Sequence, residues 1–406
     1  MEDKTVSVKG VMLYILKWLC LGAVMGVLCS GAGVLFASLI AKVTNARSNN
    51  FWFIYLLPLG GMLSVWIYKL LRVEGVSTEQ VIETVQGRKK LPIKIFPAIF
   101  FATIISHTFG ASAGKEGAAL QLGGGLAALV SRFLKLDNND YRILTTCTMG
   151  AFFSALFGTP FAACFFALEV AVMGKIYLSA LLPSLVSCSV AAFLSQLLGG
   201  HAEHYTITNI PHLSLSSVLS VILLSVIGLA VSFLFCKFLA VCEVYLPRLI
   251  KNSYLRIVLG SVVIIVLTLL IGNTDYNGGG THVIERIMAG GEVNNFAFVL
   301  KALFTVVSVS CGFKGGEIVP TLFIGASLGC VIAPFLGLPA VFGAAVGMIS
   351  LFCGATKCPL ASFFLSVEMF GGKGILFFAI CVLFSYLPIE KTGLYTSQKF
   401  ILKYRA

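Results

Sequence analysis

GKEGAALQLGGG (114–125) is the stretch of sequence that decides the fold of this chain. Apolar sequence surrounds it, with IKIFPAIFFATIISHTFGASA before it and LAALVSRFL after it. An ionised side chain at membrane depth costs roughly 2.5–3.5 kcal/mol on insertion scales, so an ionised Glu116 is energetically unfavourable in such a setting. The carboxylate therefore indicates a functional site, and the glycines beside it indicate an interrupted helix.

The composition is typical of a membrane protein. Of the 406 residues, 58% are hydrophobic and only 11% are charged, whereas about a quarter of an average soluble domain is charged. Apolar runs of roughly 17–25 residues, the length that spans a bilayer, recur along the chain. The first run, 11–40, is too long for a signal peptide and is interpreted as the first span. We expect an all-α polytopic protein in the lipid bilayer.

The net charge of +12 does not indicate a nucleic-acid partner, because the basic residues lie mostly in short connections between apolar runs. The connections 87–94 and 247–256 are basic, whereas 199–212 contains no Lys or Arg. Cytoplasmic loops carry the excess of Lys and Arg, so the two basic connections are predicted to be cytoplasmic and 199–212 external. The N-terminus is then cytoplasmic, and the protein is a multi-pass protein of the cell membrane.

The sequence offers no support for a cofactor or for an enzyme. The twelve cysteines are scattered through apolar runs without a CxxC pair, and the five histidines show no HExxH spacing. GxSxG is absent, and 110–117 lacks the GxxxxGK[ST] spacing of a phosphate loop. We therefore predict no metal site, no nucleotide site and no paired nucleophile and base.

The chain contains two copies of one pattern. PFAACFFALEV (160–170) matches PLASFFLSVEM (359–369), with Glu169 and Glu368 in the same place. Upstream, the segment that begins at Gly114 matches GGEIVPTLFIGASLG (315–329), and both place Gly-x-Glu before an apolar helix rich in small residues. The spacing from the first to the second glutamate is nearly the same in both copies, which indicates an internal duplication.

The duplication predicts two transmembrane halves, 1–212 and 213–406, related as an inverted repeat. Repeated halves are typical of transporters, in which interrupted helices present their N-termini to an anion near the midplane. Pro160 and Pro359 stand where helix starts favour proline. The alternative interpretation is that the small residues form GxxxG-like packing faces, which would explain the glycines but not the glutamates.

A helix N-terminus offers free backbone N–H groups and the positive end of the helix dipole, and glycine lets an ion approach that backbone. Two such termini would bind an anion without a fixed cation, and therefore weakly enough for release. The candidate anion-binding residues are Gly114, Lys115, Gly117, Ala118, Gly316, Glu317, Ile318 and Val319. Glu116 could occupy the anion's place and leave it on protonation, as a gate and proton carrier; alternatively, it is a simple helix cap.

The flanking motifs resemble those of the CLC family of anion channels and transporters. GKEGAA is similar to the family's Gly-Arg/Lys-Glu-Gly motif, GGEIVP to its second-half motif, and GGGTHVIERI (278–287) to the start of a later helix. GLYTSQ (393–398) is similar to the segment whose tyrosine coordinates the central anion. The resemblance implies an inverted repeat of broken, tilted helices, a homodimer with one pore per subunit, a gating role for Glu116, and Tyr395 as an anion ligand. We expect no cytoplasmic regulatory domain.

Three positions bear on the branch of the family. Val170 stands where the family's chloride/proton exchangers carry a second proton-accepting glutamate, which disfavours classical chloride/proton exchange. Glu317 replaces a neutral residue and resembles the fluoride branch, although it could instead be a glutamate paired with Lys314. Val76 or Ser77, depending on the alignment, occupies the selectivity position, and the stretch around it, VEGVSTEQVIETV (73–85), fits neither branch's pattern well.

The sequence thus predicts a halide transporter, with fluoride/proton antiport that exports fluoride as the first hypothesis. A chloride transporter or a voltage-gated-type chloride channel of the same family is the alternative. The expected partners are a halide anion, fluoride or chloride, and protons.

Overall fold

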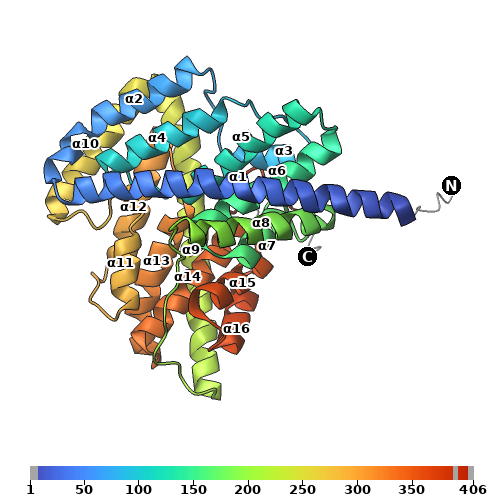
Figure 1. The fold of residues 1–406 in the computed structure, drawn as a ribbon. Coiled ribbons are helices and arrows are strands. Elements are labelled where there is room, and N and C mark those ends of the chain that lie inside the picture. Colours follow the sequence, from blue (N-terminus) through green and yellow to red (C-terminus); the bar gives the residue numbers. More distant parts are fainter. Residues whose placement is uncertain (1–7, 387–391, 401–406) are drawn as a thin grey trace.

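The computed structural model describes residues 8–386 and 392–400, and within them it is almost entirely helical (Figure 1). The first part of the chain forms α1 (Val8–Ser48), α2 (Leu57–Leu70), α3 (Thr78–Val85), α4 (Ile95–Phe109), α5 (Glu116–Leu134), α6 (Asn138–Phe157), α7 (Pro160–Glu169) and α8 (Leu181–Leu197). The second part forms α9 (Leu215–Leu249), α10 (Ser253–Ile271), α11 (Thr281–Met288), α12 (Ala297–Cys311), α13 (Ile318–Ile332), α14 (Ala340–Thr356), α15 (Pro359–Phe370) and α16 (Ile375–Ser385).

Short elements complete the described chain. They are the 3₁₀ turns η1 (Phe51–Leu56), η2 (Leu178–Ala180) and η3 (Ala333–Leu336), and the strands β1 (Val172–Met173) and β2 (Lys399–Phe400). The two strands pair in parallel, with Val172 opposite Lys399. This small ladder attaches the end of the described chain to the connection that follows α7.

Seven helical segments in the described residues are long and apolar enough to cross a membrane. The expected first span is the 41-residue helix α1, and the long span expected at 215–246 is the 35-residue helix α9. Other apolar helices, such as α7 and α15, are much shorter than a bilayer-spanning helix. The predicted all-α polytopic fold with interrupted helices is therefore confirmed.

The two longest helices run in different directions. In Figure 1, α1 (blue) runs across the molecule, whereas α9 (yellow-green) runs from its middle toward the bottom of the view. Helices of similar place in the two halves also lie side by side, as α2 and α10 do at the left of the figure. Helices α5 and α13, which begin at the two Gly-x-Glu motifs, pack against α6 and α14 respectively.

Several glycines later in the two motifs do serve packing, as the alternative interpretation proposed. A Cβ on Gly123 would lie 2.5 Å from the carbonyl oxygen of Thr148 in α6. In the second half, Gly325 and Gly347 lie so close that a Cβ on either would collide with the other's carbonyl oxygen. These glycines let α5 and α13 approach their neighbours closely, but they lie away from the glutamates.

The short helices α7 and α15 form an antiparallel pair in which each helix caps the start of the other. The carboxylate of Glu368, near the end of α15, accepts hydrogen bonds from the amides of Phe161 and Ala162 at 2.9 and 2.8 Å. The carboxylate of Glu169, at the end of α7, accepts from the amides of Leu360 and Ala361 at 3.3 and 3.0 Å. Each glutamate thus satisfies the free N–H groups at the start of the other helix.

Candidate functional site

The starts of α5 and α13 meet inside the protein. Gly114 and Gly316 form an isolated antiparallel bridge, in which the amide of Gly114 donates to the carbonyl of Gly316 at 2.6 Å. The amide of Gly316 donates to the carbonyl of Gly114 at 2.7 Å. Two segments about half a chain apart are therefore joined through their backbones at the point where each helix begins.

Only glycine fits this junction. A Cβ on Gly117 would collide with the Cα of Gly316, and a Cβ on Gly316 would lie 2.5 Å from the Cα of Gly117. A real Cβ does not approach backbone atoms this closely, so a side chain at either position would push the two helix starts apart. The glycines flanking the glutamates consequently bring two positive helix termini together.

Glu116 is the first residue of α5 and is 1% exposed. Neither of its carboxylate oxygens has a hydrogen-bond partner among the described residues. A Cβ on Gly114 would lie 2.5 Å from Oε2 of Glu116, so the carboxylate lies against the bridge. An orphaned buried carboxylate is unfavourable, which makes a purely structural cap a poor explanation.

Glu116 lines a cavity of about 330 Å³, here called the Glu116 cavity. Its polar wall comes from elements far apart in the sequence and includes Arg47, His107, Lys115, Glu203, Asn277 and Glu285. The side chains of Lys115 and Glu203 form an ion pair at 4.0 Å. Gly114 and Val319 also line this cavity, so the starts of both helices open into it.

A smaller cavity of about 100 Å³, here called the Tyr395 cavity, lies beside the other end of the junction, where Gly315 forms part of its wall. Val76, Ser77, Glu317 and Tyr395 line it together, which brings four of the predicted site residues into one place. Tyr395 is 3% exposed, and its hydroxyl has no hydrogen-bond partner in the described part of the chain. Glu317 precedes α13 directly, and its side chain makes no capping hydrogen bond to that helix.

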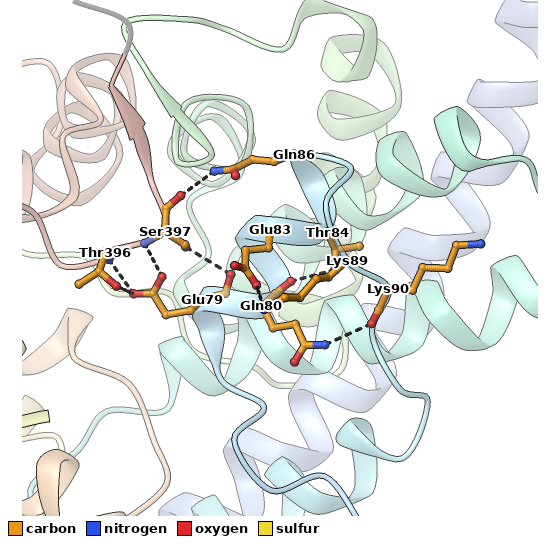
Figure 2. Close-up of polar contacts among 9 residues, drawn as sticks. All are labelled: Glu79, Gln80, Glu83, Thr84, Gln86, Lys89, Lys90, Thr396 and Ser397. Carbon is orange, nitrogen blue, oxygen red and sulfur yellow. Dashed lines mark hydrogen bonds and ion pairs between the residues drawn. The ribbon is translucent and has the colours of Figure 1, made fainter. Parts of the chain in front are cut away.

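The segment that carries Tyr395 is fastened to α3, as Figure 2 shows. The carboxylate of Glu79 accepts hydrogen bonds from the amides of Thr396 and Ser397, both at 2.6 Å. Nε2 of Gln86 donates to the carbonyl of Ser397 at 2.8 Å. These contacts anchor the backbone of the two residues directly after Tyr395.

Some predicted residues lie elsewhere. Ala118 and Ile318 are fully buried and line neither of the two cavities. Lys314, suggested as a partner for Glu317, has its ammonium 4.4 Å from the ring centre of Tyr68. No ion pair joins Lys314 to Glu317 within the described ranges.

The sequence analysis did not identify Arg47, Asn277 or Glu79 as site residues. Arg47 is the last-turn cation of a very long first span, and Asn277 directly precedes the triple glycine 278–280. Those two signals were present in the sequence, but neither showed which cavity the side chain would reach. Glu79 carried no such signal, since its partners lie 317 and 318 residues away along the chain.

The family model described as "Voltage gated chloride channel" matches residues 60–388. The chain belongs to the CLC family of anion channels and transporters. The match covers most of the chain and both Gly-x-Glu motifs, and together with the membrane-spanning helices it identifies a multi-pass membrane protein.

The relatives of this CLC protein include halide transporters of more than one kind. A protein of Pseudomonas syringae pv. tomato, named "Chloride/fluoride channel protein", is 33% identical over 95% of this chain and 87% of its own length. The crystal structure of a CLC-type fluoride/proton antiporter, 30% identical, superposes with a TM-score of 0.91 over 97% of this chain and 99% of that one. A slow cyanobacterial Cl⁻/H⁺ antiporter shares the fold, with a TM-score of 0.80 at 20% identity over 91% and 93% of the two chains.

Proposed function

We propose that this CLC protein exchanges a halide for protons across the cell membrane, and that Glu116 carries the proton and gates the anion. The observation that carries the proposal is a buried, unpartnered carboxylate placed against the junction of two helix starts. Helix N-termini favour negative charge, so a carboxylate and an anion compete for this place. Protonation removes the charge of Glu116 and leaves the place to the anion.

The two cavities provide the two ends of the anion path. The Glu116 cavity includes His201 and Glu203 from the connection without Lys or Arg, which supports an external position. The Tyr395 cavity includes Glu243, which lies close to the basic connection 247–256 and supports a cytoplasmic position. An anion leaving the cell would pass the Tyr395 hydroxyl, the backbone around the junction, and then the Glu116 cavity.

Glu317 is our candidate for the inner half of the proton path. Val170, which stands where chloride/proton exchangers carry a glutamate, is fully buried and cannot bind a proton. Glu317 lines the Tyr395 cavity and does not cap α13 with its side chain, whereas Glu169, the neighbour of Val170, is held by the amides of Leu360 and Ala361.

Fluoride is the ion that the comparisons favour, because the relative at 33% identity is named for chloride and fluoride, and the antiporter structure at 30% identity is titled for fluoride. Chloride transport is the second candidate, favoured by the shared fold of the cyanobacterial antiporter. Efflux of fluoride and chloride in competition, from vesicles loaded with equal concentrations, distinguishes them. Preference for fluoride supports the proposal, and preference for chloride contradicts it.

Proton coupling is tested in liposomes that contain the purified protein and an outward fluoride gradient. We expect fluoride efflux to drive protons inward against their own gradient. The variant Glu116→Ala should lose this coupled proton flux. Coupled proton flux that survives in this variant would contradict the role of Glu116, and fluoride flux without any proton flux in the wild type would indicate a channel.

We also propose that two copies form a homodimer, each with its own path, as the family resemblance implies. Photobleaching of singly labelled subunits in a bilayer tests the assembly. Two bleaching steps per particle support the dimer, whereas single steps at low and high protein density contradict it.

A further inference from the structure

Arg47 is a buried cation that the proposed mechanism does not use. It ends α1, is 6% exposed, and lines the Glu116 cavity. Its Nη1 donates to the carbonyl of His107 at 2.5 Å, but its Nε has no hydrogen-bond partner among the described residues. A guanidinium carries five N–H donors, so one bond to a carbonyl leaves most of them free.

Two other basic side chains in the wall of this cavity have acidic partners. Lys115 pairs with Glu203 at 4.0 Å, and Nε2 of His282 lies 3.4 Å from Asp275, which also pairs with Arg286 at 2.6 Å. The hydrogen bond from His282 and the neighbouring Arg286 hold the pKa of Asp275, in the loop before α11, at about 2. Asp275 therefore stays ionised and compensates the charge of Arg286.

Neither Arg47 nor the nearby Lys301 has a carboxylate within ion-pair distance in the described ranges. Lys301 is fully buried and donates to the carbonyls of Tyr276 and Gly278 at 3.1 and 2.6 Å. The guanidinium contacts the same loop, since a Cβ on Gly278 would lie 3.0 Å from Nη2 of Arg47. A buried guanidinium without a carboxylate partner is unfavourable, and an anion in the cavity would compensate it.

We propose that Arg47 binds a small monovalent anion in the Glu116 cavity. The cavity then provides an intermediate binding site that the anion occupies between solvent and the helix junction. The proposal rests on the proposed function, because it treats this cavity as the outer part of the anion path. The guanidinium supplies charge-assisted N–H donors to an anion that has lost part of its water. Glu203 and Glu285 in the same wall keep the attraction moderate, so that the anion can move on.

A purely structural role is the competing explanation. The bond to His107 lies in the last turn of α4, where a cation stabilises the free carbonyls of a helix end. That role would affect the stability of the protein and the maximal transport rate. It would not change how the rate depends on the anion concentration at the Glu116 cavity.

The test measures anion uptake by proteoliposomes while the anion concentration is varied only on the side of the Glu116 cavity. Arg47→Gln should raise KM about tenfold, the effect expected for a lost charged hydrogen bond, with the maximal rate within about twofold. The control Arg286→Gln, at a residue that pairs with Asp275 and does not line the cavity, should leave KM within about twofold. A wild-type KM in Arg47→Gln, or a fall in rate alone, overturns the proposal.

Arg47→Lys covers the case in which Arg47→Gln does not fold. Lysine keeps the positive charge but lacks the planar guanidinium group and its N–H donors, so KM should rise about threefold. A wild-type KM in this variant overturns direct binding. If the wild type moves anions without protons, antiport fails while this comparison remains valid. If it moves no anion, fluoride titration of the solubilised proteins by calorimetry makes the same comparison of affinities.

Discussion

Glutamates lie at two pairs of helix starts in this protein, but their carboxylates make different contacts at the two pairs. At the α7–α15 pair, Glu169 and Glu368 each bind the free amides of the opposite helix. At the α5–α13 pair, the carboxylate of Glu116 has no hydrogen-bond partner among the described residues, and the side chain of Glu317 does not cap α13. A glutamate whose carboxylate accepts hydrogen bonds from the amides of a helix start leaves those amides unavailable to an anion. On our proposal, a glutamate beside a helix start without such bonds can be replaced there by an anion.

The largest effect on coupled proton flux is expected when a glutamate of the α5–α13 pair is compared with one of the α7–α15 pair. Glu116→Gln removes the titratable group from the junction, and coupled proton flux should fall about 100-fold or more, because acid–base groups of this kind contribute at least that much. The matched variant Glu368→Gln changes the same residue type at the α7–α15 pair and should keep coupled flux within about twofold. Equal losses in both variants, measured as proton uptake per anion released, would contradict the distinction.

Adding a Cβ at the junction of the α5 and α13 starts should reduce anion flux. Gly316→Ala places a Cβ against the backbone of Gly117, and such overpacking costs about 1–3 kcal/mol or forces the helix starts apart. We expect anion flux to fall about tenfold in the protein that still inserts. Gly372→Ala is the control, because no atom lies within 4 Å of its added Cβ. Wild-type flux in both variants would show that the helix starts need not meet.

The position of Tyr395 should depend on the Glu79 contacts shown in Figure 2. Glu79→Gln replaces a charged acceptor of the Thr396 and Ser397 amides by a neutral one and should loosen the segment that carries the tyrosine. The anion KM measured from the side of the Tyr395 cavity should rise about threefold to fivefold. The nearby Glu83→Gln, which loses only a surface ion pair with Lys89, is the control. Unchanged KM in both variants would mean that other contacts fix Tyr395.

Much of the fold and of the junction could be predicted from the sequence, because both depend on local patterns. Apolar runs predicted spans α1 and α9, and glycines around a glutamate in an apolar setting predicted the starts of α5 and α13. The matching of Glu169 with Glu368 was also visible in the sequence. That each caps the other helix was not, since it depends on an antiparallel contact between distant segments.

The contributions of Arg47, Asn277 and Glu79 could not be predicted for the same reason. Each reaches its place through a helix direction and a long-range contact, such as the hydrogen bond from Asn277 to the carbonyl of Gly110. Local patterns also could not distinguish the residues of the first helical turns that face a cavity from those that face the core. Val319 faces the Glu116 cavity, whereas Ala118 and Ile318 are buried in packing contacts.

The smallest effect on transport is expected at Glu169, although its effect on stability should be clear. Glu169→Gln keeps one acceptor oxygen but places an amide group where the carboxylate now accepts from Leu360 and Ala361. Leaving a buried N–H unsatisfied costs about 1–3 kcal/mol, so the thermal midpoint of the purified protein should fall while coupled flux stays within about twofold. Glu74→Gln, at an exposed position, should change neither quantity. Proton coupling lost in Glu169→Gln at unchanged stability would mean that the glutamates of the α7–α15 pair also exchange protons as Glu116 does.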